Sequence, residues 1–149
     1  MRLFVDTWGW VTLCNRKEPY HEQVQAFYLA ARQQRLFVST TDYVLDETFT
    51  LLFRRLPFPQ AVRALTIVDR AIRESYLNLE WITSQRFERA KELRLQLHDK
   101  PHISFTDLTS MVVMAELSID SVLTDDAHFL QVGAGFQLVP RLSRPEGTQ

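Results

Sequence analysis

The chain has 149 residues, of which 46% are apolar and 23% charged, and a formal net charge of −1. This length fits one ordinary globular domain, and the balanced charge excludes a protein held on nucleic acid or membranes by bulk charge alone. The single cysteine, Cys14, excludes an intramolecular disulfide and a cysteine-based zinc cage. No apolar run is long enough to cross a bilayer, and Asp6 interrupts the apolar N-terminal stretch. We therefore expect no membrane span and no signal peptide, and a cytoplasmic protein.

Short apolar stretches alternate with segments of helical periodicity along the chain. The predicted strands are 3–5, 36–38, 77–82, 121–124 and 136–139. The predicted helices are 21–32, 42–55, 59–74, 84–98 and 107–118, with a short helical turn over 127–132, and a brief apolar segment over 8–14 follows the first strand. Strands separated by helices predict an α/β fold with a central, mainly parallel sheet of about five strands covered on both faces. We expect one domain over 1–142 and a polar tail over 143–149.

Acidic residues lie where a ligand site of such a sheet is expected, beyond the carboxyl ends of its strands. Asp6 follows the first strand, and Asp125 and Asp126 follow the fourth. Asp107 lies in the first turn of a predicted helix among apolar neighbours, and Glu47 lies within another helix. Each residue also has an ordinary interpretation as a helix cap, an Asx-turn or part of a solvated helix face. Taken together, their positions favour one shared site.

Carboxylates gathered at one sheet edge repel one another, and a divalent cation is the usual remedy. Ligands that are all oxygen suit Mg²⁺ or Mn²⁺. Such an ion can orient a phosphodiester, lower the pKa of a water and stabilise the leaving oxygen. The pattern therefore predicts metal-assisted phosphodiester hydrolysis.

Four segments of the chain resemble the motifs of the PIN-domain family of metal-dependent ribonucleases, and in particular its VapC-like toxins of bacterial toxin–antitoxin pairs. They occur in the family's order and span nearly the whole chain. The four segments are Leu3–Thr7, Val44–Thr48, Ser104–Leu108 and Val122–Phe129. The resemblance implies that 1–142 is a PIN-like nuclease domain and that the chain is a Mg²⁺- or Mn²⁺-dependent endoribonuclease.

The resemblance also implies a role for each matching residue. The implied catalytic quartet is Asp6, Glu47, Asp107 and Asp126. This quartet would hold the Mg²⁺ or Mn²⁺ ion, while Thr124 and Thr7 would support the site. The Thr-x-Asp form of the motif favours Asp126 over Asp125 as the fourth carboxylate. The adjacent pair leaves this choice open, and Asp125 is otherwise a further ligand or an outer partner. Asp46 beside Glu47 leaves a similar choice, although neighbouring helical side chains point about 100° apart.

A nuclease also needs a positive path for its substrate. Residues 54–100 carry ten basic and six acidic side chains, against two and six in residues 101–149. Arg54 and Arg55, at the end of the helix that carries Glu47, are the candidate RNA contacts. The basic residues of 86–94 are as well explained by ion pairs on a solvated helix face.

We expect a toxin that cleaves RNA, is neutralised by an antitoxin and forms a homodimer. Two alternatives stay open: an RNA- or protein-binding module with little catalysis, and an RNA-processing nuclease without an antitoxin. Nucleotide-binding glycine motifs are absent, and so is the context of a nucleophilic serine. The four histidines form no convincing metal site, since His98 and His102 flank a proline and His21 and His128 are isolated.

Overall fold

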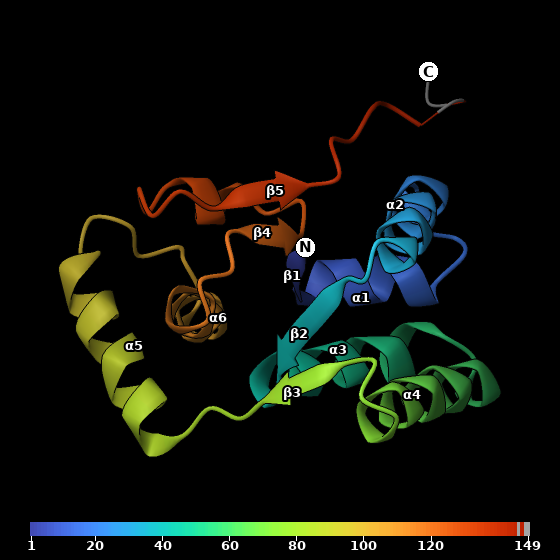
Figure 1. Cartoon of the computed structure of the whole chain (residues 1–149), viewed down its shortest axis with the longest axis horizontal. Coiled ribbons are helices and arrows are strands. Elements are labelled where there is room, and N and C mark those ends of the chain that lie inside the picture. The colour runs from blue at the N-terminus through green and yellow to red at the C-terminus, as the bar shows by residue number, and fades with distance from the viewer. Residues whose placement is uncertain (146, 148–149) are drawn as a thin grey trace.

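The computed structural model describes residues 1–145 and 147, and it confirms the predicted α/β fold with a parallel sheet (Figure 1). Within that part of the chain the sheet has five strands, all parallel, in the order β3-β2-β1-β4-β5. The strands are β1 (Arg2–Val5), β2 (Phe37–Thr41), β3 (Asn78–Glu80), β4 (Ser121–Leu123) and β5 (Gln137–Val139). Leu3, Phe4 and Val5 of the central strand are fully buried, as the uninterrupted apolar run predicts.

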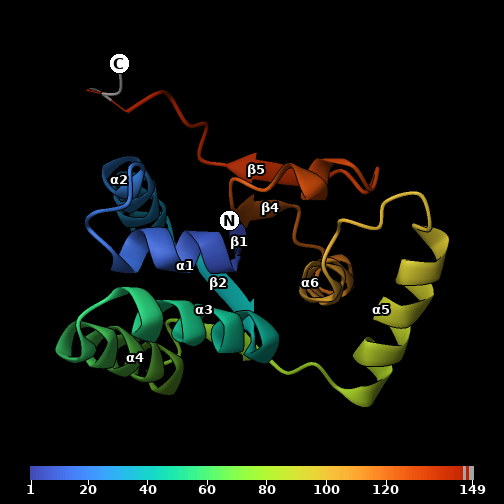
Figure 2. The same cartoon turned by 180° about the vertical axis from the view of Figure 1, so that it is seen from behind.

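Helices cover the sheet in two groups. The helices are α1 (Thr7–Cys14), α2 (His21–Gln33), α3 (Asp42–Arg55), α4 (Phe58–Arg73), α5 (Ser84–Gln96) and α6 (Phe105–Glu116), with a 3₁₀ turn η1 (Ala127–Leu130). In both views α1 to α4 gather at one side of the molecule, and α6 lies between the sheet and α5 (Figures 1 and 2). None of the helices in the described residues has the length and apolar character needed to cross a membrane.

The strand order reverses between β1 and β4. We call the region beyond the carboxyl ends of these two strands the gap. From β1 the chain builds β2 and β3 on one side, then returns to build β4 and β5 on the other. Ligands of open α/β sheets bind at such a reversal, beyond the carboxyl ends of the two strands involved. These ends are Val5 and Leu123, which are paired in register. The segments that follow them, beginning with Asp6 and Thr124, therefore face each other across the gap.

Two elements near this edge differ from the sequence prediction. The apolar segment over 8–14 is part of α1, a helix with no amphipathic period because it packs against α2 and α3 while its Gly9 lies against the ends of β1 and β4. β2 continues through Thr41 rather than ending at residue 38. The buried Thr40 accounts for this extension, since its hydroxyl donates to the Val5 carbonyl (3.0 Å) and accepts from the Trp10 indole (3.1 Å). Because the Thr40 hydroxyl has hydrogen-bond partners inside the protein, it can lie in a buried strand.

Two arginines of α5, Arg86 and Arg94, lie in the basic stretch 86–94 and bind α5 to neighbouring parts of the chain. The Arg86 guanidinium, 14% exposed, lies 2.9 Å from carboxylate oxygens of both Glu80 and Glu116. Arg94 donates to three backbone carbonyls of the turn that follows α5. These arginines are occupied in structural contacts, which favours the ion-pair interpretation of 86–94.

The predicted tail lies only partly within the described residues, because 146, 148 and 149 fall outside them. Ser143 is tethered to α2, where its backbone N–H donates to Gln23 (3.0 Å) and its carbonyl accepts from the same side chain (2.8 Å). The boundary at 142 stays a prediction.

Candidate active site

Asp6 lies at the gap beyond the carboxyl ends of β1 and β4 and is 5% exposed. Its Oδ2 accepts a hydrogen bond from the Thr124 hydroxyl (3.0 Å), and that hydroxyl accepts one from the Asp126 backbone N–H (3.1 Å). One threonine therefore joins the end of β1 to the loop after β4. The Thr7 backbone N–H also lowers the pKa of Asp6, while the Thr7 hydroxyl is buried and has no hydrogen-bond partner within the described part of the chain.

Asp107 reaches the same gap from the first turn of α6. Ser104 caps that helix, accepting from the Asp107 backbone N–H (3.0 Å), so the first turn and its carboxylate are fixed in place. Asp107 is 8% exposed. A carboxylate this deeply buried is costly unless it is paired, protonated or bound to a cation.

The pKa values of the two buried aspartates are raised, because ionisation is unfavourable in the buried site. Burial raises the pKa of Asp6 to about 6, and the charges of Glu47 and Asp126 add to the rise against the hydrogen bonds from Thr7 and Thr124. Burial raises the pKa of Asp107 to about 7, with repulsion from Asp6 and Asp126 as the next causes. Near neutral pH the cluster therefore holds mutually repelling charges that a divalent cation would neutralise.

The structure distinguishes the acidic neighbours that the sequence left open. Asp126 adds to the pKa rise of both Asp6 and Asp107, whereas Asp125 is exposed and acts on neither. Asp126 also caps η1, its Oδ1 accepting from the His128 backbone N–H (2.9 Å). This geometry favours Asp126 as the fourth carboxylate.

The electrostatics of Asp6 also distinguish the two neighbouring acidic residues of α3. Glu47 is exposed, and its charge acts on the buried Asp6. Asp46 is also exposed but is not among the charges that shift the Asp6 pKa. Residues one apart on a helix point in different directions, so only one of the two can face the gap. The structure favours Glu47.

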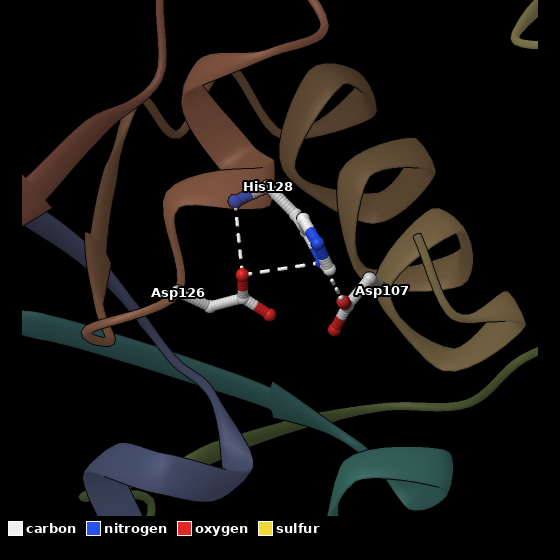
Figure 3. Close-up of side chains that lie close together, drawn as sticks. All are labelled: Asp107, Asp126 and His128. Atoms are coloured by element: carbon white, nitrogen blue, oxygen red, sulfur yellow. Dashed lines mark hydrogen bonds and ion pairs between the residues drawn. The ribbon is translucent and has the colours of Figure 1, made fainter. Parts of the chain in front are cut away.

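His128, which the sequence left without a role, lies at the cluster (Figure 3). Its Nδ1 is 3.2 Å from Asp126 Oδ1 and 3.8 Å from Asp107 Oδ2. Each of these three residues offers a ligand atom, and the three atoms lie within 4.8 Å of one another. The only sequence signal was the spacing of two residues from Asp126.

Arg54 and Arg55 lie in the last turn of α3, whereas the first turn of α3 directly follows β2. Eight residues separate Arg55 from Glu47, which is about 12 Å along a helix. Arg55 instead lies 3.9 Å from Glu18, in the segment that follows α1. Both arginines are exposed. Their backbones lie about two helical turns from Glu47, a position suited to contacts with a long substrate.

Comparison with known proteins agrees with this arrangement. The model of the PIN domain matches residues 3–135. The chain is 33% identical over 131 residues to the 23S rRNA-specific endonuclease VapC20 of Mycobacterium tuberculosis, covering 88% of this chain and 94% of that protein. The crystal structure of VapC20, a sarcin–ricin loop cleaving toxin, aligns with a TM-score of 0.75 over 92% of this chain and 98% of its own.

A more distant structure shares the fold alone. VapBC2 from Rickettsia felis, bound to a DNA fragment from its promoter, aligns with a TM-score of 0.67 at 18% identity, covering 93% of this chain and 97% of its own. The family match over most of the chain and the identity to VapC20 lead to one conclusion. The chain belongs to the PIN domain family.

Proposed function

We propose that the chain is a divalent-metal-dependent endoribonuclease and the toxin of a toxin–antitoxin pair, acting in the cytoplasm where ribosomal RNA is found. The observation that carries this proposal is the pair of buried carboxylates, Asp6 and Asp107, whose pKa values are raised to about 6 and about 7 at the reversal point of the sheet. The 33% identity to a 23S rRNA-specific endonuclease supports RNA as the substrate.

The donor set fits Mg²⁺ or Mn²⁺. Asp6, Asp107 and Asp126 offer carboxylate oxygens from three separate segments, and the repulsion among them is what a bound cation removes. When bound, the ion supplies a Lewis acid that orients a phosphodiester and favours ionisation of a water. Thr124 holds the Asp6 carboxylate in one orientation through its 3.0 Å hydrogen bond.

Glu47 takes a different role from the aspartates in this proposal. It is the exposed carboxylate of the cluster, so water and substrate reach it without disturbing the core. We assign to Glu47 the removal of the proton from the attacking water, at its carboxylate oxygens. The buried aspartates are positioned to hold the ion and the phosphodiester instead.

A groove of about 980 Å³ between α2 and α4, with α1 at its floor, is the proposed antitoxin site. The floor is apolar and includes Trp10, Leu13 and Val68. The rim is strongly basic, with Arg16, Lys17, Arg32, Arg63 and Arg70. An acidic segment with apolar side chains complements both surfaces, which supports an antitoxin segment as the occupant.

The homodimer also belongs to this proposal. Two apolar side chains of α4 outside the groove, Phe58 and Val62, are 70% and 38% exposed, and exposed apolar patches often mark protein interfaces. We expect the purified chain to have twice its formula mass in light scattering, and Phe58→Asp to yield monomer. A monomeric unmodified chain at micromolar concentration would remove the dimer from the proposal.

The nuclease proposal is tested by cleavage of 23S rRNA, including a fragment with its sarcin–ricin loop, by purified chain free of antitoxin. We expect cleavage with Mn²⁺ or Mg²⁺, none in EDTA, and none by folded Asp6→Asn or Asp107→Asn. Asp99→Asn is the matched control, because Asp99 is an exposed aspartate paired with Lys100 (3.0 Å). No cleavage by folded, metal-loaded protein would favour the RNA- or protein-binding module instead.

A separate experiment tests Arg54 and Arg55 as RNA contacts. Replacing both with alanine is expected to weaken RNA binding and reduce its salt dependence, because fewer counterions are released. The control pair is Arg89 and Lys91, which carry the same charge but lie next to Glu116 (3.4 Å) and Glu88 (2.9 Å). An equal loss of salt dependence in both pairs would show an unspecific effect of net charge.

A further inference from the structure

The imidazole of His128 is held against the acidic cluster by the turn that carries it. Its backbone N–H donates to Asp126 Oδ1 (2.9 Å), and this bond closes η1 so that the side chain folds back over the same carboxylate (Figure 3). Asp107 approaches the ring from α6, 3.8 Å from Nδ1. The ring nitrogen therefore faces two carboxylates from two different elements.

Nδ1 has no hydrogen-bond partner within the described residues, although it is buried. Asp126 Oδ1 is 3.2 Å away, but the direction of approach does not make a hydrogen bond. A buried polar nitrogen without a partner is rare and calls for an explanation, such as an ion that it binds.

The distances are close to those between ligands of one metal ion. Ligand atoms about 2.1 Å from an octahedral ion lie about 3.0 Å apart when adjacent and about 4.2 Å apart when opposite. The separation of Nδ1 from Asp126 Oδ1, 3.2 Å, is close to the adjacent value, its separation from Asp107 Oδ2, 3.8 Å, lies between the two values, and all three ligand atoms lie within 4.8 Å of one another. One ion can therefore contact all three atoms with little movement of the side chains.

We propose that Nδ1 of His128 is a direct ligand of the divalent ion, which makes the centre a mixed nitrogen–oxygen site. This inference rests on the proposed metal-dependent function. An imidazole ligand favours Mn²⁺ and later transition metals over Mg²⁺, which prefers oxygen. The proposal therefore assigns the chain a preference for Mn²⁺ over Mg²⁺, set by a residue outside the acidic quartet.

The test measures Mn²⁺ coordination directly, without activity. Electron spin-echo envelope modulation of the Mn²⁺-loaded chain is expected to show nitrogen coupling, and labelling histidine with ¹⁵N is expected to change it. This experiment uses the unmodified chain, so it does not depend on a variant that folds. Mn²⁺ that binds without nitrogen coupling would overturn the proposal and leave the metal-dependent nuclease intact, whereas no Mn²⁺ binding at all would overturn both.

Affinity supplies the second readout. We expect His128→Asn, which replaces the nitrogen with an amide of similar reach, to weaken Mn²⁺ binding about tenfold or more and to change Mg²⁺ binding far less, so the Mn²⁺/Mg²⁺ ratio falls. His98→Asn is the matched control, since His98 is exposed beyond the end of α5. An equal loss for both ions would assign His128 to positioning Asp126 and would refute direct coordination.

Discussion

Replacing Asp107 with asparagine is expected to stabilise the metal-free protein near pH 8, although it removes an active-site residue. The pKa of Asp107 rises from 3.8 to about 7, so in the folded protein its ionised form is disfavoured by roughly three pKa units. At about 1.36 kcal/mol per unit, this penalty has an upper bound of about 4 kcal/mol. Asparagine keeps the size and polarity without the charge, so we expect a gain of about 2–4 kcal/mol in the free energy of unfolding.

The sign of the effect depends on pH. Because its folded-state pKa is raised, Asp107 binds its proton more tightly in the folded chain, and its contribution to stability decreases as pH rises from about 4 to about 7. Below pH 4 the carboxyl is neutral in both states, and the two proteins should then have similar stability. Urea unfolding in EDTA at pH 4 and pH 8 measures the difference.

Three outcomes of this experiment are informative. A gain at pH 8 that vanishes at pH 4 supports a charged, repelled carboxylate. An Asp107→Asn protein that is no more stable at pH 8, or that gains equally at both pH values, would refute the electrostatic reasoning. Mn²⁺ adds a further check, since it should stabilise the unmodified chain according to its concentration and affinity and the variant much less.

Three further perturbations test how the site is built. Gly9→Ala is expected to cost about 2–3 kcal/mol in urea unfolding, since the added Cβ would lie 2.6 Å from a backbone oxygen of β4. Thr124→Val removes a hydrogen bond that lowers the pKa of Asp6, so Mn²⁺ binding should require higher pH in a calorimetric pH series; an unchanged profile would contradict that role. Arg86→Ala breaks two partly buried ion pairs, so that Glu116 keeps only the more exposed Arg89, and should cost about 2–3 kcal/mol, whereas Lys91→Ala, at an exposed pair, should cost under about 1 kcal/mol; equal losses would contradict the structural role of Arg86.

Local patterns in the sequence were sufficient for the strands, most helices and the positions of the buried aspartates. A short apolar run marks a buried strand wherever it occurs, and Asp6 directly follows one. Ser104 before Asp107 is a local capping signal, and the helix begins there. In these cases the physical cause lies within a few residues of the feature.

Local patterns were not sufficient for α1 or for the end of β2. α1 carries no charged residue because it is enclosed by α2, α3 and the strand ends, so it shows no helical period. Thr40 lies in the core because Val5 and Trp10 satisfy its hydroxyl. Hydrogen-bond partners about thirty residues away cannot be inferred from a polar residue alone.

The sequence by itself determined the parallel α/β architecture and brought the acidic segments to one edge, since each follows a recognisable strand or opens a helix. Only the tertiary structure decided which side chains meet there. Thr124 bonds to Asp6 across 118 residues, Asp126 rather than its neighbour acts on the buried pair, and His128 faces Asp107 from another element. The reason is physical: side-chain direction depends on the rotation and packing of whole helices and strands, which are fixed by contacts distant in sequence.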